Sequence, residues 1–136
     1  MRPLILALLG TAAVLAEIRT VWDGVYTAAQ AERGKAGYEI HCQTCHGRDL
    51  SGGSDGDDPA PALIQKNFGE NRKDLNNLYT YIRTSMPRDE AGTLESQAAI
   101  DIVAYLLARN SFPPGSAELP ADPDALQQIS TRRKSP

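Results

Sequence analysis

Cys42-Gln43-Thr44-Cys45-His46 holds both cysteines of the chain and one of its two histidines. The C-x-x-C-H spacing is typical of covalent haem attachment. In such a motif each thiol adds to one vinyl group of a haem, and the histidine imidazole binds the iron. The stretch therefore predicts one haem c, with Cys42 and Cys45 as its covalent anchors and His46 as an axial ligand of the iron.

The same pair of cysteines permits haem-free interpretations: a thioredoxin-like redox pair, part of a zinc site, or a plain disulfide. For zinc, only His41 and His46 are near, and both are so close to the cysteines that a tetrahedral shell would be cramped. A thioredoxin-like motif follows a buried strand, whereas the residues before Cys42 have a helical pattern. A disulfide gives His46 no role, so haem attachment is the favoured interpretation.

The N-terminal residues have the pattern of a secretory signal peptide. Arg2 supplies a positive charge, residues 4–15 form an apolar run, and Val14-Leu15-Ala16 ends in a small residue. The run is shorter than the roughly twenty residues of a membrane-spanning helix. We expect cleavage after Ala16, with Ala13 as a second possible site, and a periplasmic or otherwise exported protein. Retention of the segment would instead anchor the protein to a membrane.

Cleavage leaves residues 17–136, the length of one domain, with an expected core of about 26–112 and a C-terminal strap of 113–136. Lys and Arg total 14, of which Arg2 is lost with the signal peptide, against 17 acidic residues. The mature chain therefore has a net charge of −4. This balance gives no reason to expect nucleic-acid binding.

Helical periodicity predicts an all-α fold of three to four helices around one haem. A first helix runs from Thr27 as N-cap to about Ile40, with Gly34 and Tyr38 on one face. A second spans 74–84 and ends before Pro87. A third begins at Ser96 as N-cap and runs to Asn110. The apolar stripes of the second and third helices are Leu75, Leu78, Tyr79 and Ile82, and Ile100, Val103, Ala104 and Leu107.

The remaining segments have no convincing strand pattern. Residues 17–27 are expected to be an extended lead-in, and residues 47–61 a loop rich in Gly, Ser, Asp and Pro. Residues 123–129 favour a short helical turn. The acidic residues of the loop do not have the spacing of an EF-hand, so a solvated loop is favoured over a calcium site. These acidic residues are Asp55, Asp57 and Asp58.

Met86 is the candidate for the second axial ligand, because it is the only methionine left after signal cleavage and lies in a loop stiffened by Pro87. His/Met ligation raises the reduction potential of a haem. The competing role for Met86 is core packing. His41 adjoins Cys42 on the same side as His46, and Lys66 or Lys73 would ligate only in an alkaline or misfolded form.

A neutral His46 needs an acceptor for its Nδ1–H, and a backbone carbonyl is the usual partner. A proline carbonyl in the loop after the motif is a natural candidate. Of the two prolines there, Pro61 is preferred to Pro59.

With these residues in place, the chain resembles class I, mono-haem c-type cytochromes from about Val21 to Ile129. The resemblance implies that Gly34 and Tyr38 lie where the first helix crosses the last, opposite Tyr105. It implies one-electron transfer by an electron carrier rather than an enzyme. The matching segments are Cys42-Gln43-Thr44-Cys45-His46-Gly47, Pro61-Ala62-Leu63, residues 78–87 and residues 101–107.

Residues 22–34 and the segments 110–115 and 118–120 are similar to small bacterial cytochromes c associated with pyrroloquinoline-quinone dehydrogenases. The resemblance implies redox protein partners, with a quinoprotein dehydrogenase as donor and a terminal oxidase or another cytochrome as acceptor. Many relatives have a glycine where Gln65 stands and a tryptophan within the stretch read here as 70–73. These departures leave the haem residues intact.

Other functions remain open from the sequence. The chain could be the haem subunit of a dehydrogenase complex. An iron without Met86 would instead favour peroxidase chemistry or the binding of a diatomic gas.

Overall fold

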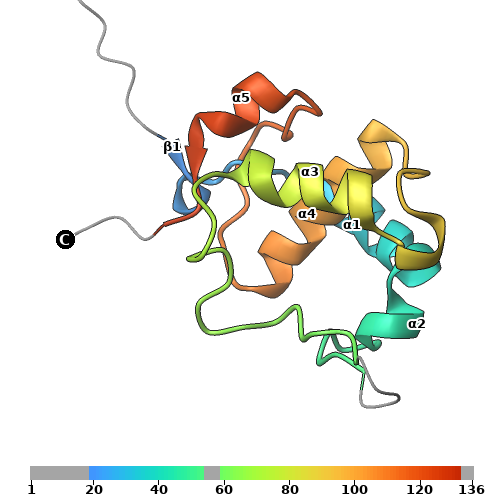
Figure 1. Cartoon of the computed structure of the whole chain (residues 1–136). Helices are drawn as coiled ribbons and strands as arrows, with labels where there is room; N and C mark the ends of the chain where they lie inside the picture. Colours follow the sequence, from blue (N-terminus) through green and yellow to red (C-terminus); the bar gives the residue numbers. More distant parts are fainter. Residues whose placement is uncertain (1–18, 54–58, 133–136) are drawn as a thin grey trace, which may run out of the picture.

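The computed structural model describes residues 19–53 and 59–132 (Figure 1). The expected signal peptide, ending at Ala16, and the acidic residues Asp55, Asp57 and Asp58 lie outside these ranges. The elements in chain order are β1 (Arg19–Thr20), the 3₁₀ helix η1 (Val21–Asp23), α1 (Ala28–His41), α2 (Gln43–His46), α3 (Leu75–Ser85), the 3₁₀ helix η2 (Arg88–Glu90), α4 (Ser96–Arg109), α5 (Pro123–Gln127) and β2 (Ile129–Ser130).

Side chains cap both α1 and α3: Thr27 is the N-cap that the sequence predicted, whereas Asp74, expected within the first turn of the second helix, is the N-cap of α3. Thr27 Oγ1 accepts a hydrogen bond from Gln30 N at 3.1 Å. Asp74 Oδ1 accepts one from Asn77 N at 3.1 Å. Each bond satisfies a backbone N–H that has no partner within its helix. The predicted apolar stripe of α3 is buried, so this helix packs as its periodicity indicated.

The prediction that Ser96 caps α4 is wrong by one residue. Glu95 has the extended N-cap conformation and makes no side-chain cap, while Ser96 is the first helical residue. Leu94, which precedes the cap, is only 4% exposed. Burial of the residue before the cap fixes how the chain approaches a helix, and here it outweighs the capping preference of serine. All residues from Ala99 to Leu107 are buried, which makes α4 the central element of the fold.

The crossing of α1 over α4 depends on Gly34. A Cβ atom built at Gly34 would overlap the carbonyl oxygen of Asp101 and lie 2.9 Å from the Tyr105 Cβ. Only a residue without a side chain allows the two backbones to approach so closely. One turn further along α1, the rings of Tyr38 and Tyr105 pack with centroids 5.3 Å apart. The predicted packing role of Gly34 is therefore confirmed.

The two ends of the described chain pair as short strands, which the sequence did not predict. β1 and β2 form a short parallel pair, with Arg19 opposite Ile129. Ile129 thus belongs to a strand rather than to the helical turn expected over 123–129. The lead-in is likewise not wholly extended, because it contains η1. The buried set reaches beyond the expected core of 26–112, through Val21, Val25, Leu119, Leu126 and Ile129.

The C-terminal strap is held to α1 by polar contacts. Gln30 is fully buried and exchanges two hydrogen bonds with the backbone of Leu119, at 2.8 and 3.0 Å. Arg33 pairs with Asp101 of α4 at 2.9 Å and with Glu118 of the strap at 2.8 Å. A hydrogen bond from Arg33 lowers the pKa of the Glu118 carboxyl. These contacts hold the strap against α1 and α4.

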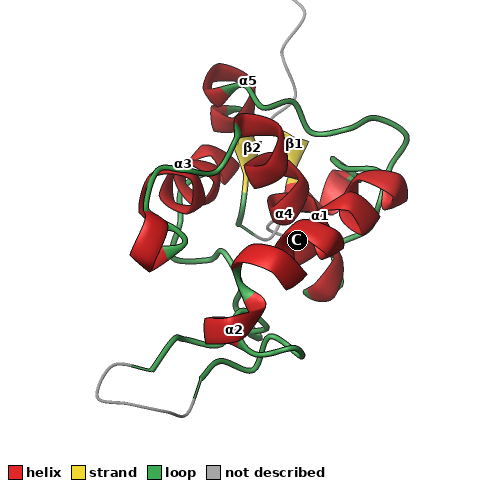
Figure 2. Ribbon diagram, turned by 90° about the vertical axis from the view of Figure 1, so that its right-hand side faces the viewer, coloured by secondary structure: helices red, strands yellow, loops and turns green. Residues whose placement is uncertain are grey.

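Both ribbon views place α2 at one end of the molecule and α5 with the strand pair at the other (Figures 1 and 2). α3 packs against α4 and α5. Within the described ranges, none of the helices combines the length and the apolar character that a bilayer crossing requires.

Candidate functional site

The motif forms a single helical turn at the end of α1. Cys42 closes α1 by donating its N–H to Tyr38 O at 2.9 Å, and its own carbonyl accepts a hydrogen bond from His46 N at 2.9 Å. Residues three and four apart on a helix share a face. The turn therefore brings Cys42, Cys45 and His46 together. The Tyr38 hydroxyl donates to Gly47 O at 2.7 Å and fixes the end of the turn.

The two thiols are free and differ in exposure: Cys42 is half-buried and Cys45 is exposed. Burial, and to a lesser degree the neighbouring Cys45, raises the pKa of the Cys42 thiol to about 11. A thioredoxin-like redox pair depends on a cysteine whose pKa is lowered so that a thiolate forms near neutral pH. The environment of Cys42 opposes that haem-free interpretation.

His46 is 8% exposed, and its ring is oriented by the loop that follows the motif. Its Nδ1 lies 2.9 Å from the carbonyl oxygen of Pro61. With the proton on Nδ1, the imidazole donates to this carbonyl and Nε2 keeps a free lone pair. Orientation of a metal-binding histidine by a backbone carbonyl is a common arrangement. The structure thus brings together the two residues that the sequence had paired.

The loop returns to the motif through a tight approach at Gly52. Gly52 N–H donates to His46 O at 2.9 Å, and Gly53 N–H donates to Ala60 O at 3.0 Å. Gly52 has φ +91°, and a Cβ there would lie 2.7 Å from Ala60 O. This position requires glycine, because an L residue would be strained and would also clash. The close contact at Gly52 thus fixes how near the segment that carries Pro61 lies to His46.

Asn110 anchors the same loop from the end of α4, a role that the sequence analysis missed. Its Nδ2 donates to Leu63 O and to Leu106 O, both at 2.8 Å. Its Oδ1 accepts from Gln65 N at 3.0 Å. Asparagine at a helix C-terminus is common, so the sequence contained no signal that distinguished this residue from an ordinary helix end.

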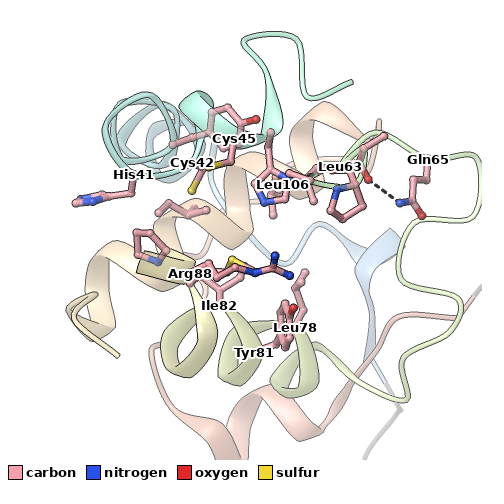
Figure 3. Close-up of a pocket in the computed structure, with 18 of the residues that line it drawn as sticks. His41, Cys42, Cys45, Leu63, Gln65, Leu78, Tyr81, Ile82, Arg88 and Leu106 are labelled. Carbon is pink, nitrogen blue, oxygen red and sulfur yellow. Dashed lines mark hydrogen bonds between the residues drawn. The ribbon is translucent and has the colours of Figure 1, made fainter. Parts of the chain in front are cut away.

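A cavity of about 650 Å³ opens between the motif and α3. Figure 3 shows Leu78, Tyr81 and Ile82 of α3 on one side of it, and Cys42, Cys45, Leu63 and Leu106 on the other. His46 and Pro61 also line it. Its volume is within the range of ligand pockets, about 300–1,000 Å³. The side chains that give it an apolar surface are Leu63, Phe68, Leu78, Ile82, Ile102 and Leu106.

Met86 lines this cavity from the end of α3. It is the C-cap residue of α3, with its N–H donating to Ile82 O at 3.1 Å, and its backbone is extended. It is joined to Pro87 by a cis peptide bond. The methionine is therefore attached to the α3 side of the cavity, whereas His46 is attached to the motif turn.

The donor set in the cavity fits a covalently attached haem. Two thiols three residues apart, an imidazole with Nδ1 engaged, and a thioether line one large and mainly apolar space. Cys, His and Met are the side chains that hold haem in c-type cytochromes. His41 is exposed and lines only the rim, where Figure 3 shows its ring turned outward. Lys66 and Lys73 are exposed and do not line the cavity.

Comparison with known proteins gives two matches. Residues 29–106, more than half of the chain, match the family model described as cytochrome C oxidase, cbb3-type, subunit III. Among solved structures, the chain is similar to a chain of the sulfane dehydrogenase SoxCD from Paracoccus pantotrophus, at 22% sequence identity and a TM-score of 0.51. That likeness covers 90% of this chain and 67% of the other, and it concerns the fold alone. No curated protein matches the sequence.

We expect Asn110→Ala to reduce the free energy of unfolding of the haem-loaded protein by about 1–3 kcal/mol, because three backbone groups lose their hydrogen bonds to this side chain. Denaturant unfolding followed by far-UV circular dichroism measures the change. Asn67→Ala is the matched control, because Asn67 is exposed in the same loop, and we expect it to change stability by no more than about 0.5 kcal/mol. Equal stability of the two variants would contradict the anchoring role of Asn110.

Proposed function

Because the chain belongs to the family described as cytochrome C oxidase, cbb3-type, subunit III, we propose that it transfers single electrons with His46 and Met86 as the two axial ligands of its haem iron. The chain is a mono-haem c-type cytochrome with an all-α fold and acts as an electron carrier. The observation that carries the proposal is the presence of both side chains in one cavity, on different elements.

Cys42 and Cys45 would hold the haem by thioether bonds, and His46 and Met86 would fill the axial positions. When bound, the haem supplies the one-electron change between Fe(II) and Fe(III). The remaining residues determine which state is favoured. A methionine thioether favours Fe(II) and so raises the reduction potential.

The surrounding chain keeps these donors in position. The contact between Pro61 O and His46 Nδ1 selects the tautomer that leaves Nε2 available to the cavity. Asn110 and the approach at Gly52 hold the segment that carries Pro61. The apolar residues of α3 and α4 give the cavity a surface of low dielectric constant, and such a surrounding favours the less charged state of a metal centre. With His46 and Met86 both bound to it, the iron would have no open position for a substrate.

The test of the proposed ligands is Met86→Ala. We expect wild-type ferric protein to have the weak long-wavelength absorption band of a sulfur-ligated haem and the ferrous protein not to bind CO. Met86→Ala should lose the band and take up CO, because one axial position is open. Absorption spectra of purified protein in both redox states measure both effects.

Ser85→Ala is the control for this experiment, since Ser85 adjoins Met86 but does not line the cavity. It should keep the wild-type spectrum. Uptake of CO by the wild-type ferrous protein would contradict His/Met ligation and favour a gas-binding or peroxidase function.

We also propose that redox partners approach an exposed, mildly positive surface formed by residues 66–90. Asp74 is buried as the N-cap of α3, which removes one acidic group from this surface. Arg72 and Arg88 lie at the cavity itself. The partner would therefore carry acidic groups, in the weak and small interface that is usual for redox encounters. The exposed or partly exposed charged residues here are Lys66, Arg72, Lys73, Arg83 and Arg88 against Glu70, Asp89 and Glu90.

The bimolecular rate of electron transfer to an acidic redox protein should fall as ionic strength rises, because salt screens the attraction over about 10 Å at 0.1 M. Stopped-flow spectroscopy at several salt concentrations measures this rate. A rate that does not depend on salt would refute the electrostatic docking, without bearing on the haem ligands.

We propose in addition that the chain is exported and cleaved after Ala16, because its N-terminus has a signal-peptide pattern and haem c is attached outside the bacterial cytoplasm. The mature protein from an expressing bacterium should then begin at Glu17 and be recovered in the periplasmic fraction. Mass spectrometry of the intact protein measures the first residue. A haem-loaded chain that still begins at Met1 would contradict cleavage.

A further inference from the structure

The charges that line the cavity are all of one sign. Among the described residues that line it, Arg72 and Arg88 carry full positive charges, and none is an aspartate or a glutamate. Two guanidinium groups at an otherwise apolar cavity suit an anionic ligand. Guanidinium pairs well with carboxylate, because its planar N–H donors match two carboxylate oxygens.

Arg88 extends into the cavity from the segment that follows Met86. It is the first residue of η2. Figure 3 shows its guanidinium in the space between Leu78 and Tyr81 of α3 and Leu63 and Leu106 across the cavity. Because the backbone of Arg88 lies two residues after Met86, the guanidinium is held near the end of α3.

Arg72 reaches the same cavity from the loop before α3. Its backbone carbonyl accepts a hydrogen bond from Thr131 Oγ1 at 2.7 Å, which ties the loop to the C-terminal segment. Its guanidinium carbon lies 5.4 Å from the centroid of the Tyr81 ring. A guanidinium stacked on an aromatic face is pre-oriented and loses less freedom when it binds an anion. Tyr81 is 46% exposed, so this pair lies at the cavity mouth.

We propose that Arg72 and Arg88 bind the propionate carboxylates of the haem, an inference that rests on the proposed function. A haem has two propionates, and a carboxylate brought into an apolar cavity requires a hydrogen-bonded cation. Among the described residues that line it, the cavity provides two arginines and no aspartate or glutamate. By pairing with the propionates, the arginines stabilise the less positive ferrous state. They are positioning residues that tune the potential, and neither is a ligand of the iron. The positive groups then left to attract an acidic partner are Lys66, Lys73 and Arg83.

The test is the midpoint potential of haem-loaded Arg72→Gln and Arg88→Gln. Each variant leaves a propionate without its cation, which favours Fe(III). At the wild-type midpoint we expect the ratio of ferrous to ferric protein to fall roughly three- to tenfold in each. A tenfold change corresponds to about 59 mV for a one-electron couple. Spectroelectrochemical titration measures the ratio.

Arg83→Gln is the matched control, since it removes the same charge from an exposed position on α3 that does not line the cavity. Solvent screening should keep its effect below about twofold. Redox-difference infrared spectra supply a second readout, because carboxylate stretching bands of the propionates shift when a bound guanidinium is removed. If Arg88→Gln yields no haem-loaded protein, Arg88→Lys replaces it, and its infrared bands should shift because lysine lacks the bidentate fork.

The proposal is overturned if both glutamine variants behave like Arg83→Gln in potential, or if the propionate bands are unchanged in both. The same measurements distinguish failure of the arginine proposal from failure of the His46 and Met86 ligation. Variants that keep the long-wavelength ferric band but show no shift in potential would refute the arginine role alone. A wild-type protein without that band would refute the His/Met ligands instead.

Discussion

The close approach of α1 to α4 at Gly34 determines where the haem-binding residues lie. α1 ends in the turn that carries Cys42, Cys45 and His46, so the position of that turn follows from the crossing. α4 supplies Ile102 and Leu106 to the cavity and ends at Asn110, which holds the Pro61 segment against His46. Enlarging residue 34 would separate the two backbones and thus displace both walls of the site.

The sequence predicted most of the fold because its signals were local. Thr27 is a strong N-cap, and the apolar stripe of α3 has the helical period. The motif and its spacing identified haem, and the search for a histidine-orienting carbonyl led to Pro61, whose oxygen lies 2.9 Å from His46 Nδ1. The roles of the individual haem residues, the cleavage after Ala16 and the single-domain boundaries stay predictions.

What the sequence did not indicate depends on contacts between distant segments. The start of α4 at Ser96 follows from burial of Leu94, and the β1–β2 pair joins residues more than a hundred positions apart. Asn110 and the two cavity arginines look like ordinary polar residues until the fold brings the loops together. Tertiary packing overrides local preference at such positions, so no periodicity or motif could have revealed them.

The central claim is that one imidazole and one thioether, from His46 and Met86, fill the axial positions of the iron. X-ray absorption at the iron edge of the purified protein, in both redox states, tests it most directly. The account predicts a six-coordinate iron with one sulfur neighbour in the ferric and ferrous forms alike, and loss of that sulfur neighbour in Met86→Ala. A wild-type iron surrounded by nitrogen alone, or one with five ligands, would contradict it.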